Sequence, residues 1–115
     1  KYRLIIDEFG SYEAFQNALQ VLRKIADQYQ VGIAEVATRY TLQKPMVAAA
    51  IIGARNSKHL ARLAQLESFQ LSAEDLAAIA LVVGKAAGPS GPVYDLERDK
   101  TGKHGRIMKY NLNSD

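Results

Sequence analysis

The sequence predicts a mostly helical segment with one or two β-strands, a piece of a larger α/β fold. Between Ser11 and Val83, apolar residues recur at helical spacing in four stretches. One run of six apolar residues, Val47 to Ile52, interrupts them. Because this run does not alternate with polar residues, it predicts a strand covered on both faces, as in a parallel sheet. Such a strand needs neighbours, and the chain offers only one other candidate, Arg3 to Ile6.

Composition is that of an ordinary globular protein. The chain has 115 residues, of which 48% are hydrophobic and 23% charged, which favours one folded domain over disorder. A net charge of +3 is too small to argue for nucleic acid, and no apolar run approaches the roughly 20 residues that cross a bilayer. Cysteine is absent, which fits a cytoplasmic protein without disulfides or thiol chemistry. We therefore expect neither nucleic acid nor a membrane as partner.

Two helices are predicted before the apolar run. Gly10 interrupts the opening segment and Ser11 is a suitable helix N-cap. Apolar residues then recur at helical spacing from Phe15 to Tyr29, which predicts an amphipathic helix. A second helix is expected from Ile33 to Tyr40, with Pro45 ending it or the turn behind it.

Two more helices are predicted after the run. The third begins near Asn56 and carries Leu60 and Leu63 on one side. The fourth begins after Ser72 as N-cap, with Glu74 and Asp75 at the positive end of the helix dipole.

The segment GPSGP, residues 88–92, is a strong structure breaker. Beyond it no period is sustained, so residues 88–115 are predicted to form an extended tail behind a segment of residues 1–87. Acidic residues at alternate positions from Asp95 to Asp99 superficially open like a calcium loop. However, Lys100 occupies the place of the required glycine, and Arg106 that of the required glutamate. His59 and His104 lie far apart without further ligands at suitable spacing, so no metal site is predicted.

The end of the apolar run carries the candidate chemistry. In α/β folds, ligands collect at the carboxyl ends of strands, and Gly53 would let the backbone approach one closely. Three cationic side chains lie within eight positions, namely Arg55, Lys58 and Arg62, and His59 adds a possible hydrogen bond. The pattern predicts a phosphate-bearing ligand. The alternative is that these cations form a solvated helix face and that Gly53 simply ends the strand.

Several motifs resemble one enzyme family. The span from Leu22 to Ile79 is similar to the last barrel unit of an aldo-keto reductase, in the helix pair IA…YQVGIAEVA, the IIGAR strand end and the later LSAED cap. The tail GPVYDLERDKTGKHGRIMKYNLN also resembles the C-terminal ends of some bacterial and plant members. This resemblance implies a parent (β/α)₈ barrel that reduces a carbonyl substrate by hydride transfer from NADPH.

The resemblance also implies a binding site for the adenosine end of NADP, including its 2′-phosphate. His59 stands where the family has a polar or basic side chain reaching the same phosphate. Arg62 and Leu63 replace a common Glu-Asn pair, so Arg62 could contact phosphate while Leu63 cannot bond the adenine edge. Preference for NADP over NAD therefore stays open. The implied cofactor-binding residues are Gly53, Ala54, Arg55, Asn56, His59 and Arg62.

Nothing in the sequence matches the family's catalytic Asp, Tyr, Lys and His motifs, so no catalytic residue is assigned and this segment alone is expected to be inactive. Lys1 is expected to mark a cut in a longer chain, just after the seventh strand. The expected partners are the rest of the barrel or a second copy, bound through exposed apolar faces, and a small carbonyl substrate in the full protein.

The sequence has features of two other functional classes. A small helical protein–protein interaction module remains the alternative, since composition is compatible with it. A DNA-binding helix-turn-helix is disfavoured because its recognition helix would read MVAAAII, which cannot contact base edges.

Overall fold

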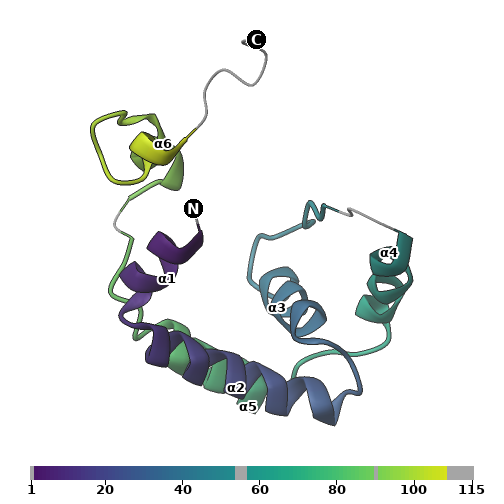
Figure 1. The fold of residues 1–115 in the computed structure, drawn as a ribbon. Helices are drawn as coiled ribbons and strands as arrows, with labels where there is room; N and C mark the ends of the chain where they lie inside the picture. The colour runs from purple at the N-terminus through teal and green to yellow at the C-terminus, as the bar shows by residue number, and fades with distance from the viewer. Residues whose placement is uncertain (1, 54–56, 90, 109–115) are drawn as a thin grey trace. The chain divides into compact units, whose positions relative to one another are not determined.

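The computed structural model describes residues 2–53, 57–89 and 91–108 (Figure 1). Within these residues the chain is mostly helical, as predicted, and contains no β-strand. No helix in this part of the chain is long and apolar enough to span a bilayer. The helices are α1 (Tyr2–Phe9), α2 (Tyr12–Gln28), α3 (Ile33–Leu42), α4 (Ser57–Leu63), α5 (Ala73–Val83) and α6 (Val93–Arg98), with 3₁₀ turns η1 (Ala64–Glu67) and η2 (Gly105–Ile107).

The chain divides into two compact units. Residues 16–84 form the first, which we call the core unit. The described residues up to 15 join those from 85 onward in the second, the terminal unit. The division into a barrel segment, residues 1–87, and a tail, residues 88–115, concerns a parent barrel and stays a prediction.

The start of α2 confirms the predicted cap at Ser11. Its side-chain oxygen accepts a hydrogen bond from the backbone N–H of Ala14 at 3.0 Å. The helix then places Ala18, Ile25 and Ala26 on its buried face, as its apolar period predicts.

The core unit is built where α2, α3 and α5 bring their apolar faces together. Val36 of α3 and Ile79 of α5 are almost completely buried there, at 0% and 2% exposure. Close packing of this kind makes these positions sensitive to any change of volume. The buried cluster consists of Ile25, Ala26, Val31, Val36, Phe69, Leu71 and Ile79.

The start of α5 confirms the predicted N-cap. The Ser72 hydroxyl accepts from the backbone N–H of Asp75 at 3.1 Å, and the Asp75 carboxylate accepts from the backbone N–H of Ser72 at 3.0 Å. This reciprocal pair is a capping box, which satisfies two backbone donors that the helix itself leaves unpaired.

A side chain ties the segment after α3 to the segment before α5. The Gln43 amide donates to the carbonyl of Leu71 at 3.1 Å, and the N–H of Leu71 donates to the Gln43 oxygen at 2.8 Å. The Gln43 side chain therefore satisfies both the N–H and the carbonyl of Leu71, as a neighbouring strand would do.

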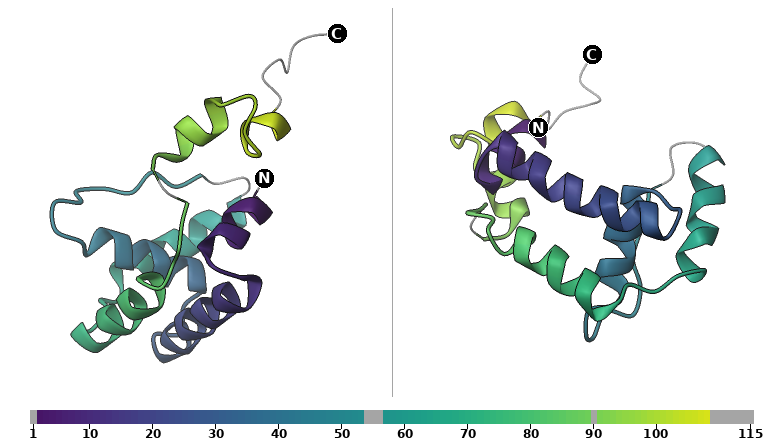
Figure 2. Two further views of the ribbon diagram at one scale, coloured as in Figure 1. Left: turned by 90° about the vertical axis from the view of Figure 1, so that its left-hand side faces the viewer. Right: turned by 90° about the horizontal axis from the view of Figure 1, so that it is seen from below.

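The strand predicted at Val47 to Ile52 is wrong for this structure. The stretch leaves α3 as an irregular extended loop (Figure 2). Met46, with a φ of 66°, and Ile51 are fully exposed. The physical reason is that a strand exists only through ladder bonds to a neighbour, and the described residues supply no neighbour.

The second strand candidate, Arg3 to Ile6, is also wrong, because these residues lie in α1. Without a strand to pair with, the helix satisfies their backbone groups locally. Arg3 and Asp7 lie one turn apart and form an ion pair at 2.9 Å, which supports the helix slightly because both side chains are largely exposed.

The third predicted helix is present as α4, which continues into η1. The prediction that the tail is extended is wrong where α6 and η2 form, at residues 93–98 and 105–107. Short-range hydrogen bonds around Asp99 organise this segment, and they leave no apolar period in the sequence.

Candidate functional site

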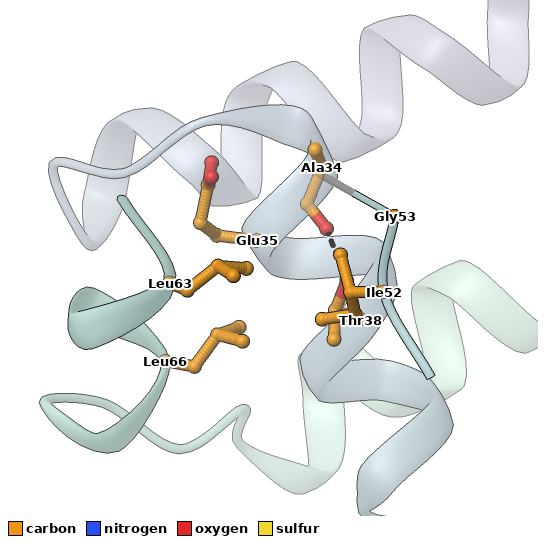
Figure 3. Close-up of a pocket in the computed structure, with 7 residues that line it drawn as sticks. All are labelled: Ala34, Glu35, Thr38, Ile52, Gly53, Leu63 and Leu66. Carbon is orange, nitrogen blue, oxygen red and sulfur yellow. Dashed lines mark hydrogen bonds between the residues drawn. The ribbon is translucent and has the colours of Figure 1, made fainter. Parts of the chain in front are cut away.

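A small pocket lies where the extended stretch ends, in the core unit. Its volume is about 140 Å³, and Figure 3 shows the residues that line it. Helix α3 supplies one wall, the end of the extended stretch a second, and the α4–η1 segment the third. The lining residues are Ala34, Glu35, Thr38, Ile52, Gly53, Leu63 and Leu66.

The floor of this pocket is apolar. Leu63 and Leu66 point from the α4–η1 segment toward α3 (Figure 3). The Thr38 hydroxyl donates to the carbonyl of Ala34 at 2.8 Å, so its proton is used within the helix. Ordinary ligand pockets enclose roughly 300 Å³ or more, so these walls could seat a ring or an apolar group but not a whole dinucleotide.

Among the predicted cofactor-binding residues that the structure describes, Gly53 lines the pocket and Arg62 does not. A methyl group built at the Gly53 α-carbon would meet no atom within 4 Å, so the space beside this backbone is open. Its φ is not among the positive values of this chain, so strain does not require glycine here. Glycine at this position leaves the backbone accessible from the open space beside it.

The other predicted residues are placed only in part. Arg62 lies in the last turn of α4 and is exposed. His59 lies within α4, but its side chain is outside the described residues. Ala54, Arg55 and Asn56 lie outside the described residues altogether.

Leu63 has a role that sequence reasoning missed. From the sequence it lies on the apolar side of the third helix and departs from the family pattern, because leucine cannot bond the adenine edge. In the structure its side chain helps form the apolar floor. Ala34 and Thr38, one turn apart on α3, form the facing wall and were also missed, because that face does not carry the helix's apolar period.

Glu35 is the buried charge beside the pocket. It is 5% exposed, and its Oε2 has no hydrogen-bond partner in the described structure. The carboxylate points away from Ile52 and Gly53, toward the loop that precedes α3 (Figure 3). There it folds back against Gly32, where a side chain would collide with it. It sits in the first turn of α3, where a negative charge suits the helix dipole.

Arg39, one turn after Glu35, does not neutralise it by a hydrogen bond. Its Nε is buried without a partner in the described structure, and its guanidinium lies 5.7 Å from the centre of the Phe69 ring. The arginine therefore stacks on the Phe69 ring of the core. Neither group is aimed at the space beside Gly53.

A metal centre finds no support in the part of the chain that the structure describes. No group of three or more potential ligand side chains is gathered there. Asp95 and Glu97 lie on α6, and Asp99 binds its own loop.

Comparison with known proteins gives one match. A family model, described as the aldo/keto reductase family, matches residues 3–83, which is more than half of the chain. The match runs from α1 to the end of α5 and stops before α6. Searches of curated proteins and of solved structures found no match.

Proposed function

Because the chain belongs to the aldo/keto reductase family, we propose that it supplies part of the NADPH site of a reductase. The reductase reduces a carbonyl substrate by hydride transfer from NADPH within a (β/α)₈ barrel. Residues 1–87 form the last barrel unit and residues 88–115 its tail. The observation that carries this proposal is the family match across the whole segment that contains the Gly-Ala-Arg-Asn sequence of residues 53–56 and α4.

The cofactor-binding residues are those from Gly53 to Asn56, together with His59 and Arg62. Two features of the structure fit the adenosine end of NADP. The backbone at Gly53 is open to approach, and the exposed Arg62 guanidinium lies in the helix that follows. Arginine suits the 2′-phosphate because its fork of N–H donors matches phosphate oxygens. Leu63 and Ile52 offer an apolar surface on which a ring could rest.

The bound cofactor supplies the hydride, and this segment holds the opposite end of the molecule. Its tasks are to bind the adenosine phosphate and to select between phosphorylated and unphosphorylated cofactors. The family's Asp, Tyr, Lys and His come from another part of the fold, so the segment by itself is inactive. We assign no catalytic residue to it.

The rest of the barrel is the proposed partner. Met46 and Ile51 expose their whole side chains, and Ala50 to Ile52 form one side of a hollow of about 420 Å³ against α3. A neighbouring strand would cover this stretch and form hydrogen bonds with its backbone. The stretch becomes a strand only when such a neighbour is present. Self-association and binding to an unrelated protein through the same stretch are the competing outcomes. Co-expression with the remaining barrel should yield a complex, and Ile51→Lys should prevent it.

Direct titration tests the cofactor proposal. In the complete reductase, Arg55→Ala and Arg62→Ala should each weaken NADPH binding by roughly tenfold or more, because each removes a charge-assisted bond to phosphate. NADH binding should change much less, because NADH lacks the 2′-phosphate. Arg98→Ala, which removes an exposed arginine from α6, is the matched control and should change neither affinity. Equal weakening of both cofactors, or of neither, would refute the phosphate assignment.

A further inference from the structure

The terminal unit joins two parts of the chain that are far apart in sequence. His104 Nε2 lies 2.9 Å from Oε1 and 3.0 Å from Oε2 of Glu8, across 96 positions. Lys103 Nζ lies 2.5 Å from the same Oε1. The His104 side chain is 6% exposed, so this is a buried contact on the imidazole side. One carboxylate of α1 therefore receives two neighbouring side chains of the C-terminal segment.

The loop that presents His104 is tightly built. Asp99 Oδ1 accepts hydrogen bonds from the Thr101 N–H at 3.0 Å and from the Thr101 hydroxyl at 2.7 Å. The N–H of Gly102 donates to the Asp99 carbonyl at 3.0 Å. These bonds close a compact turn directly before Lys103 and His104, so both side chains leave a preformed loop.

Gly105 makes the close packing of this loop possible. It is buried, and a Cβ at this position would collide with the backbone carbonyl oxygens of Asp99 and Glu97. Because these are backbone atoms, no side-chain rotation could relieve the collision. The position next to His104 is therefore restricted to glycine.

A second attachment holds the start of the C-terminal segment. The N–H of Ala87 donates to the carbonyl of Phe9 at 2.9 Å. Ala87 and Leu96 also border a hollow of about 250 Å³ together with Glu8. All these contacts involve residues after 83, where the family match ends.

We propose that residues 99–107 form a latch that closes on α1 through the Glu8 carboxylate and holds the C-terminal segment in its folded position. The latch is independent of the cofactor proposal, since it uses no residue of the candidate NADPH site. Loss of one would leave the other intact.

The charges around Glu8 make the latch sensitive to acid. Lys103 and His104 face it from the loop, Ala87 and Leu96 on the side of the hollow are apolar, and Asp7 on α1 is engaged by Arg3. Hydrogen bonds from Lys103, then from His104, lower the pKa of Glu8 below its ordinary value of 4.5. Because the pKa of Glu8 is lower in the closed form, the charged carboxylate stabilises that form at pH values above the ordinary pKa of glutamate. This stabilisation is lost as the pH falls through the lowered pKa of the folded chain. The latch should be closed at neutral pH and open in acid.

Amide hydrogen exchange of the full chain tests the latch. At pH 7, Glu8→Gln and His104→Ala should each speed the exchange of residues 102–108 by about tenfold or more, because each removes a hydrogen bond to a charged group. The double variant should exchange no faster than the faster single variant, since both changes break the same contact. Amides of Val36 and Ile79 report on the core unit and should keep their protection.

Two further variants separate the latch from general damage. Arg106→Ala removes an exposed cation from the same segment and should leave exchange unchanged. Gly105→Ala keeps Glu8 and His104 but should open the loop through its backbone collision. Unchanged exchange in Glu8→Gln and His104→Ala, or equal acceleration in Arg106→Ala, would overturn the proposal.

Discussion

Tyr29 and Asp75 are joined by a hydrogen bond of 2.6 Å in which the phenol donates to carboxylate oxygen Oδ2. The same oxygen accepts the N–H of Ser72, so one atom both caps α5 and binds the residue that follows α2. The tyrosine ring also lies 5.1 Å from the Phe69 ring. This contact therefore connects the local start of one helix to the end of another, 46 positions away.

The two groups shift each other's pKa. Because the Tyr29 phenol donates a hydrogen bond to Asp75, its proton is harder to remove. This hydrogen bond, followed by burial, raises the pKa of Tyr29 above 10.0. Burial would raise the pKa of Asp75, but the hydrogen bonds from Tyr29 and Ser72 outweigh it and lower this pKa below 3.8. Both shifts favour a neutral phenol beside a charged carboxylate.

Tyr29→Phe should lower the free energy of unfolding by about 1.5–3 kcal/mol, because it removes a hydrogen bond to a charged group and keeps the ring. Urea denaturation of the full chain measures the change. Tyr12→Phe is the matched control, since Tyr12 is 53% exposed, and it should change stability by less than about 0.5 kcal/mol. Equal effects of the two substitutions would contradict the proposed role of the Tyr29–Asp75 bond.

Ser72→Ala should destabilise the protein by about 1 kcal/mol, because it removes the acceptor for the Asp75 N–H at the start of α5. Ser72→Thr keeps a hydroxyl at the cap and should recover most of the loss. Thermal unfolding of both variants provides the comparison. An alanine variant as stable as the threonine variant would show that the cap contributes nothing.

Acid should destabilise the core unit through Asp75. Because the folded pKa of this carboxylate is lowered, the unfolded chain binds its proton first, so stability falls as pH drops below the ordinary value near 4. Urea unfolding at pH 7, 5 and 3 measures the slope. Asp75→Asn removes the titrating group and should flatten the slope, and an equally steep slope in this variant would contradict the assignment to Asp75.

Leu63→Asn should lower stability by about 1–2 kcal/mol without improving NADPH affinity, because this side chain forms part of an apolar floor. Urea unfolding and a fluorescence titration with NADPH measure the two quantities. Leu60→Asn, at a position that is 54% exposed, is the control and should be nearly neutral. Tighter NADPH binding by Leu63→Asn would show instead that position 63 reaches the adenine.

Helices α2 to α5 were predictable because their signals are local. Ser11 and Ser72 each act on a donor three residues away, and the buried face of α2 repeats every three or four residues. Of the pocket lining, Gly53 could be identified from the sequence by residue type and position, while a cofactor contact of Arg62 stays a prediction. The wall formed by Ala34 and Thr38 could not, since an alanine and a threonine on a helix indicate no ligand until another segment faces them.

The apolar run at residues 47–52 shows the opposite case. Its composition is that of a covered strand, but a strand forms by pairing with another strand, and none is present in the described chain. The hydrophobic pattern indicates that the segment is suited to being covered by neighbouring elements. The conformation of the segment depends on whether such a neighbour is there.

The sequence by itself determined where α2 and α5 begin and which face of α2 is apolar, because caps and periodicity act within about four residues. Only the tertiary structure decided that Gln43 would bind Leu71, Tyr29 would bind Asp75 and Glu8 would bind His104. These partners lie 28, 46 and 96 positions apart. No local pattern identifies such pairs, because each depends on where the whole chain brings two polar groups together.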